Sequence, residues 1–102
     1  MRYLFLLNPT AGKRDCTAEL APAIRAAAQR AGIPPEKRKV VVTQYAGHAR
    51  ELAAEAAHTA QADGEPVRIW TAGGDGTFNE ALTGAQGCSL AAVGCLPFGS
   101  GN

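Results

Sequence analysis

The stretch that decides the fold is Val67-Arg68-Ile69-Trp70-Thr71-Ala72-Gly73-Gly74-Asp75-Gly76-Thr77-Phe78-Asn79-Glu80. Its first part is an apolar run typical of a buried strand, and three glycines then occur within four positions before a helical pattern begins. A glycine turn between a strand and a helix lets main-chain N–H groups approach an anion closely, and the helix dipole favours negative charge there. Asp75 is the unexpected residue, because an acid repels phosphate unless it binds a cation or a proton, or caps the helix.

The rest of the chain repeats this strand–turn–helix pattern. Strands are expected at 3–7, 39–43, 67–71 and 90–95, and helices at about 17–31, 48–62 and 77–85. Pro22 is expected in the first turn of its helix, where proline is tolerated. Connections of this length require parallel strands. The sequence therefore predicts an α/β fold, a Rossmann-like three-layer sandwich with a mostly parallel sheet, and leaves a flavodoxin-like strand order open.

Composition excludes several classes of protein. The chain has 102 residues, a net charge of +1 and few aromatic residues, which favours one domain and gives no sign of nucleic-acid binding. No apolar run approaches the roughly 20 residues of a membrane span. Three cysteines without a CxxC pair predict no zinc site or disulfide framework, and favour a cytoplasmic protein.

Four turns follow the four predicted strands, and each contains small or polar residues. Because the carboxyl ends of parallel strands meet at one edge of a sheet, these turns predict a phosphate or nucleotide site there. The turns are Asn8-Pro9-Thr10-Ala11-Gly12, Thr43, Gly73-Gly74-Asp75-Gly76-Thr77 and Gly99-Ser100-Gly101-Asn102. Neither the Walker A loop nor the dinucleotide fingerprint G-x-G-x-x-G matches the sequence.

Four motifs in order resemble those of the diacylglycerol kinase catalytic-domain family: Asn8–Gly12, Thr43 with Gly47-His48-Ala49, Gly73–Glu80 and Pro97–Asn102. That family includes bacterial lipid kinases and sphingosine kinases, and it shares the GGDGT element with NAD kinases and 6-phosphofructokinases. The resemblance extends over essentially the whole chain. It implies an ATP-dependent lipid kinase that transfers the γ-phosphoryl group of ATP, with Mg²⁺, to a lipid hydroxyl such as that of diacylglycerol.

The resemblance also implies a set of site residues. Asp75 would act near the transferred phosphate, as a base or through Mg²⁺, and Ser100 replaces the threonine of the family's usual GTGN motif. The implied ATP-binding residues are Asn8, Pro9, Thr10, Ala11, Gly12, Thr43, Gly73, Gly74, Asp75, Gly76, Thr77, Phe78, Asn79, Glu80 and Ser100. No side chain is assigned as a direct protein ligand of a resident metal.

Alternatives remain open for several of these residues and for the function. Asp75 is also a candidate helix N-cap, and Glu80 is also a candidate surface acid. His48 and His58 are expected to be solvated helix residues. The rival functions are an NAD kinase-like phosphotransferase and a non-catalytic nucleotide-binding module.

Family members are about three times longer and have a second, β-rich domain that holds the lipid. We therefore expect residues 1–102 to be the N-terminal ATP-binding subdomain, without that lipid domain, and to be inactive alone. The expected partners are ATP and, through the absent domain, a lipid acceptor. The exposed surface left by that domain would favour a homodimer, and the full-length parent would work in the cytoplasm or at the inner membrane face.

Overall fold

The computed structural model describes residues 1–9, 17–72 and 74–96. The chain alternates strands and helices as expected, with one additional 3-10 turn. The elements are β1 (Arg2–Leu7), α1 (Thr17–Arg30), η1 (Pro35–Lys37), β2 (Arg38–Val42), α2 (His48–Asp63), β3 (Val67–Ala72), α3 (Gly74–Gly84) and β4 (Ala91–Cys95).

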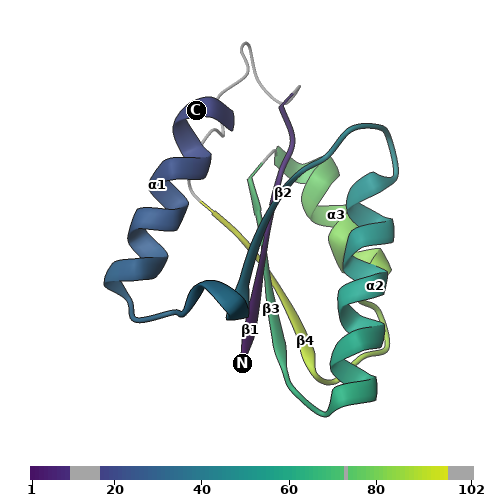
Figure 1. Cartoon of the computed structure of the whole chain (residues 1–102). Coiled ribbons are helices and arrows are strands. Elements are labelled where there is room, and N and C mark those ends of the chain that lie inside the picture. Colours follow the sequence, from purple (N-terminus) through teal and green to yellow (C-terminus); the bar gives the residue numbers. More distant parts are fainter. Residues whose placement is uncertain (10–16, 73, 97–102) are drawn as a thin grey trace.

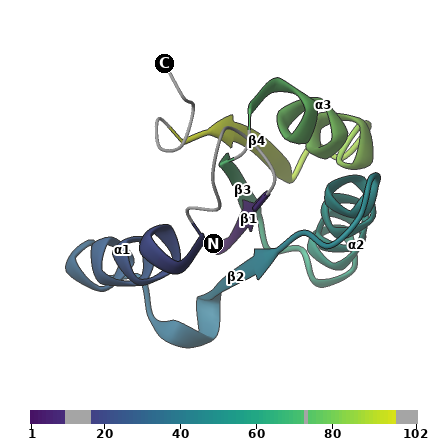
Figure 2. The same ribbon diagram turned by 90° about the horizontal axis from the view of Figure 1, so that it is seen from above.

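The four strands form one sheet in the order β2-β1-β3-β4, and every neighbouring pair is parallel. Helix α1 covers one face of the sheet, while α2 and α3 cover the other (Figures 1 and 2). The predicted three-layer α/β sandwich is therefore confirmed. Of the two strand orders left open, this is the flavodoxin-like one, in which ligands bind beside the carboxyl ends of β1 and β3.

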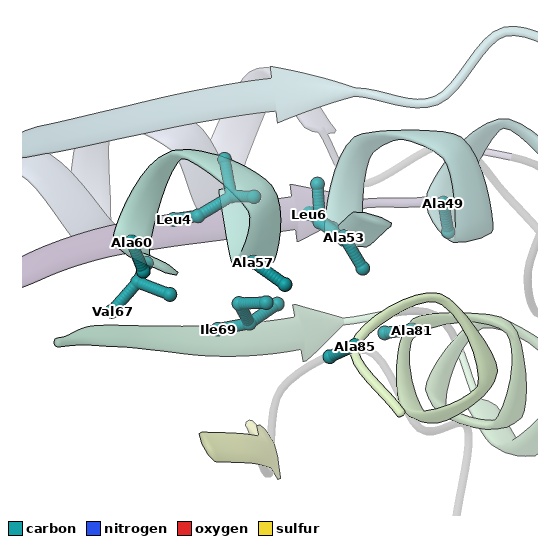
Figure 3. Close-up of a cluster of buried hydrophobic side chains, with 10 residues drawn as sticks. All are labelled: Leu4, Leu6, Ala49, Ala53, Ala57, Ala60, Val67, Ile69, Ala81 and Ala85. Atoms are coloured by element: carbon teal, nitrogen blue, oxygen red, sulfur yellow. The ribbon is translucent and has the colours of Figure 1, made fainter. Parts of the chain in front are cut away.

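Alternate residues of each central strand supply the two cores, because successive side chains point to opposite faces. Phe5 and Leu7 of β1 pack with Ile24 of α1 on one side. The other core joins β1 and β3 to α2 and α3, and its helical members are small (Figure 3). Its buried residues are Leu4, Leu6, Ala49, Ala53, Ala57, Ala60, Val67, Ile69, Ala81 and Ala85.

Helix α3 begins at Gly74, three residues before the expected start at Thr77. The sequence signal was masked by Gly74 and Gly76, which are poor helix formers. In the first turn their low propensity is offset by Asp75, whose negative charge interacts favourably with the helix dipole. The N-cap role considered for Asp75 is wrong, because Asp75 is the second residue of the helix.

Pro22 lies within α1, as its sixth residue, and not in the first turn as expected. Proline removes one helical N–H donor. The helix continues because Ile24 and Ala28 follow Pro22 and are buried, with exposed fractions of 4% each. Packing against the sheet outweighs the local preference of proline here.

Candidate functional site

A cavity of about 690 Å³ opens at the carboxyl edge of the sheet. It is bounded by the ends of β1 and β2, the turn before α2, and the first turns of α2 and α3. Its lining residues are Asn8, Pro9, Val42, Thr43, Gln44, Tyr45, Ala46, Ala49, Gly76, Thr77 and Glu80. This volume is in the range of pockets that hold small molecules and cofactors.

The floor of the cavity is fixed by main-chain bonds that extend the sheet past β1 and β2. The Asn8 N–H donates to the carbonyl oxygen of Ala72 at 2.9 Å, and the Thr43 N–H donates to that of Leu7 at 2.8 Å. The Thr43 hydroxyl also donates to the Leu7 carbonyl, at 3.3 Å. Residues 8 and 43 are therefore held in register by backbone pairing, as a preformed binding site requires.

Asn8 connects the end of β1 to the start of α3. Its side-chain amide donates a hydrogen bond to the hydroxyl oxygen of Thr77, with a nitrogen–oxygen distance of 3.0 Å. The Thr77 side chain is buried, with only 4% exposed. This bond fixes the position of the first turn of α3 relative to the sheet.

Part of the first turn of α3 is exposed, at Asp75 and Gly76. A Cβ atom added at Gly76 would meet no atom of the described residues within 4 Å, so none of these residues fills the space beside this main chain. The N–H groups of a first helical turn have no partners within the helix. Open space next to them suits a phosphate group.

Glu80, one turn further along α3, reaches the turn before α2. Its carboxylate accepts the Gly47 N–H at 3.2 Å, and its side chain is half-buried. Gly47 is the N-cap of α2 and has φ +90°, a conformation that favours glycine. Glu80 is thus a contact between two helices at the cavity wall, and the surface-acid alternative is wrong for this residue.

Other candidates from the sequence lie elsewhere. Asp75 is exposed at the start of α3 and is not among the residues that line the cavity. Phe78 does not line it either, and Asn79 lines a separate groove with Leu82 and Thr83. Side chains on a helix turn by about 100° per residue, so 76, 77 and 80 share a face that 78 and 79 do not. The candidates outside the described residues are Thr10, Ala11, Gly12, Gly73 and Ser100.

The turn between β2 and α2 contains contacts that the sequence did not reveal. His48 was expected to be solvated, but its Nδ1 accepts the Gln44 N–H at 2.9 Å. Its ring stacks on that of Tyr45, with centroids 4.4 Å apart. His58 is exposed, as expected. The short distance in sequence between His48 and the end of a strand was the available sequence signal for this contact. The bond to Gln44 could not be predicted from it, because the bond depends on the conformation of the turn.

Tyr45 forms part of the cavity wall although 55% of it is exposed. Its hydroxyl donates to the Glu51 carboxylate at 2.6 Å. This hydrogen bond is the main reason that the pKa of Tyr45 is raised, with smaller effects of desolvation and of the negative charge. Tyr45 is therefore a neutral hydrogen-bond donor at physiological pH.

Residues 1–9, 17–72 and 74–96 contain neither a metal-binding cluster nor a helix that could span a membrane. No three His, Cys, Asp or Glu side chains in this part of the chain gather as a metal site would require. None of its helices combines the length and apolar character needed to cross a bilayer.

Comparison with known proteins gives consistent results. The model of the family described as "Diacylglycerol kinase catalytic domain" matches residues 2–102. Sphingoid long-chain bases kinase 1 of Arabidopsis thaliana is 35% identical over 108 residues, which is 99% of this chain and 13% of that protein. The chain therefore spans about an eighth of the length of that curated relative.

A solved structure supports the fold. The crystal structure of a candidate diacylglycerol kinase from Bacillus anthracis strain Sterne superposes with a TM-score of 0.66 at 23% identity. The alignment covers 94% of this chain and 30% of that one. With the family match over almost every residue, the conclusion is that this chain belongs to the diacylglycerol kinase catalytic-domain family.

Proposed function

We propose that this chain is the ATP-binding part of a lipid kinase that transfers the γ-phosphoryl group of Mg-ATP to a lipid hydroxyl. The observation that carries the proposal is the convergence of Asn8, Thr43, Gly76, Thr77 and Glu80 on one cavity at the carboxyl edge of a parallel sheet. Membership of the family supplies the reaction class.

The cavity suits the nucleoside of a nucleoside triphosphate, and the first turn of α3 suits its phosphates. Tyr45, Ala46 and Ala49 give one wall an apolar surface that fits a nucleoside. The phosphates would lie on the open main chain at Gly76, where N–H groups and the helix dipole favour anions. Residues 10–12, 73 and 100 lie outside the described residues, and they are proposed for the ATP site on their sequence motifs alone.

Asp75 is the proposed catalytic residue. Mg²⁺ is commonly held by one or two carboxylates together with phosphate oxygens, so a single exposed acid beside the phosphate position fits such an ion. Bound Mg²⁺ would neutralise charge on the transferred group. The carboxylate of Asp75 would then orient the ion or accept the proton of the attacking hydroxyl.

The acceptor is proposed to be a lipid alcohol. The Arabidopsis relative is named for sphingoid long-chain bases and the Bacillus protein for diacylglycerol, which are both lipids with a free hydroxyl. The alignment covers 30% of the Bacillus protein, so the acceptor site of that protein is not assigned to residues of this chain. The protein would then work at the cytoplasmic face of a membrane.

The first experiment measures binding of ATP to the 102-residue chain by calorimetry, with and without Mg²⁺. We expect binding that strengthens with Mg²⁺. Asp75→Asn should weaken the effect of Mg²⁺ without unfolding the chain, because Asp75 is exposed. The matched control is Glu55→Gln, an exposed acid on α2 away from this cavity. Absence of ATP binding by a folded chain would contradict the proposed site.

The second experiment measures transfer in a form of the protein that also carries the lipid domain. Diacylglycerol, a sphingoid base and NAD are offered as acceptors with labelled ATP. Label should pass to a lipid, and Asp75→Asn should lower its rate by about 10²- to 10⁴-fold. Transfer to NAD alone would favour the NAD kinase-like alternative, while unchanged lipid turnover in Asp75→Asn would remove the role given to Asp75.

A further inference from the structure

One wall of the cavity is the turn that joins β2 to α2, residues 44–47, which Glu80 and Glu51 contact at Gly47 and Tyr45. Gln44, Tyr45 and Ala46 are all exposed, so burial contributes little to its conformation. Gly47 is the N-cap of α2, and, as a glycine, it has no side chain that could bond to the first turn of the helix. Exposed turns with little packing are normally among the least stable parts of a fold.

His48 provides three contacts to this turn. Its Nδ1 accepts the Gln44 N–H at 2.9 Å, and the main-chain N–H of His48 donates to the Tyr45 carbonyl at 3.1 Å. Its imidazole lies nearly parallel to the Tyr45 ring, at an interplanar angle of 19°. His48 itself is half-buried, whereas its bond to Gln44 is exposed. One residue therefore fixes both the first peptide of the turn and its aromatic ring.

We propose that His48 is a positioning residue for the nucleotide: it holds the wall formed by residues 44–47 in the binding conformation, and does so only while Nδ1 is unprotonated. This inference rests on the proposed function, in which that cavity binds ATP. An imidazole nitrogen that accepts a hydrogen bond cannot carry a proton at the same time. Protonation would replace the acceptor by a donor facing the Gln44 N–H, and the turn would lose its first bond.

Two substitutions separate the contributions of His48. Asn places an oxygen close to the position of Nδ1, so His48→Asn keeps an acceptor that does not titrate and loses the ring. His48→Phe keeps a ring that can stack on Tyr45 and loses the acceptor. His58→Asn is the matched control, because His58 lies on the same helix, is exposed and does not line this cavity.

The first readout is hydrogen exchange of the Gln44 amide at one fixed pH without nucleotide. Loss of one hydrogen bond worth about 1 kcal/mol corresponds to an increase in the exchange rate of roughly fivefold. We expect His48→Phe to raise the exchange rate by about that factor, and His48→Asn and His58→Asn to stay near wild type. ATP affinity at pH 8 should follow the same order, with His48→Phe weakest.

The second readout is ATP affinity at pH 8 and pH 5.5. Wild type and His58→Asn should lose more affinity than His48→Asn as the pH falls. Protonation of ATP itself affects all three proteins equally. The ratio of the wild-type affinity to the His48→Asn affinity therefore reports the effect of His48 alone. The other titratable groups bonded to this turn are Tyr45, Glu51 and Glu80. The ratio should therefore keep its pH dependence in Glu51→Gln and Glu80→Gln backgrounds.

The outcomes distinguish this inference from the proposed function. Strong ATP binding with wild-type Gln44 exchange in His48→Phe would overturn the positioning role and leave the ATP site intact. An identical pH dependence in wild type and His48→Asn would overturn the requirement for an unprotonated nitrogen. No ATP binding by wild type would overturn the proposed function, and the nucleotide role of His48 with it, even if His48→Phe freed the Gln44 amide.

Discussion

At the scale of single residues, Asn8 and Thr77 show how one hydrogen bond can organise the site. Asn8 follows a central strand, and Thr77 lies in the first turn of α3 with its hydroxyl buried. The bond between them joins two segments 69 residues apart in the sequence. Both side chains line the cavity, so this bond fixes two of its walls relative to one another.

A double-mutant cycle on this pair tests its contribution. Asn8→Ala and Thr77→Val should each destabilise the fold, and their coupling energy should be about 0.5–1.5 kcal/mol, as for one net hydrogen bond. Urea unfolding of wild type, both single variants and the double variant measures it. As a control, Thr83→Val removes a hydroxyl that bonds within α3, to the Asn79 carbonyl. Equal coupling of Asn8→Ala with that control would contradict a specific bond.

At the scale of elements, the contact between α2 and α3 depends on small residues. Ala49, Ala53 and Ala81 belong to one buried core, so the two helices approach closely (Figure 3). Gly84 lies directly against α2. A Cβ atom added there would approach the carbonyl oxygen of Arg50 too closely for any real contact. A glycine at the end of α3 is therefore required by the neighbouring helix.

Gly84→Ala should destabilise the fold by about 1–3 kcal/mol, because the helices must separate to admit one methyl group. Alanine is the better helix former, so propensity alone predicts the opposite sign. Gly76→Ala is the matched control for stability, since its Cβ would meet no atom within 4 Å in the part of the chain that the structure describes. Thermal unfolding of the two variants checks the difference. Equal melting temperatures would show that the close approach does not constrain residue 84.

At the scale of the whole molecule, a charged cluster lies at the opposite edge of the sheet from the cavity. Glu65 lies before β3 and contacts Lys37 at 2.8 Å and the amino group of Met1 at 3.1 Å. Arg2 contacts Glu65 at 3.2 Å and Asp63 at 2.6 Å. These pairs connect the starts of β1 and β3 to η1. The hydrogen bond from Lys37 and that from the amino group lower the pKa of Glu65 to about 2.

This shift predicts a pH dependence of stability. The pKa of Glu65 is lower in the folded chain than its ordinary value of 4.5, so its contribution is complete above pH 4.5 and is lost as the pH falls towards 2. Glu65→Gln should therefore be less stable than wild type at pH 7, with a difference that shrinks between pH 4.5 and 2. Urea unfolding across that range measures it.

The difference in stability between wild type and Glu65→Gln should be modest and should decrease with salt, because the ion pairs are partly exposed. Glu55→Gln, an exposed acid on α2, serves as the reference for loss of a charge alone. If the difference in the free energy of unfolding between wild type and Glu65→Gln stays constant from pH 7 to pH 2, the pH dependence of stability does not arise from the Glu65 carboxylate.

Much of the fold could be predicted from the sequence. Continuous apolar runs marked the strands of a parallel sheet, and helical spacing of alanines marked α2 within one residue at its end. The start of α3 was harder, because Gly74 and Gly76 have low helix propensity and are helical only through their position in the first turn. The packing of α3 against its neighbours decides which of its side chains line the cavity. Glu80 does so, whereas Phe78 and Asn79 do not.

The sequence by itself determined the alternation of strands and helices, and it predicted a site at the carboxyl edge of the sheet. These follow from local periodicity and from the rule that parallel strands end together. Only the tertiary structure decided the strand order, the rotation of α3 and the contacts of Asn8, His48 and Glu80. The physical reason is the sequence separation of the interactions involved. Local periodicity indicates which residues are buried, whereas the pairing of strands and the rotation of helices depend on packing between segments that are far apart in the chain.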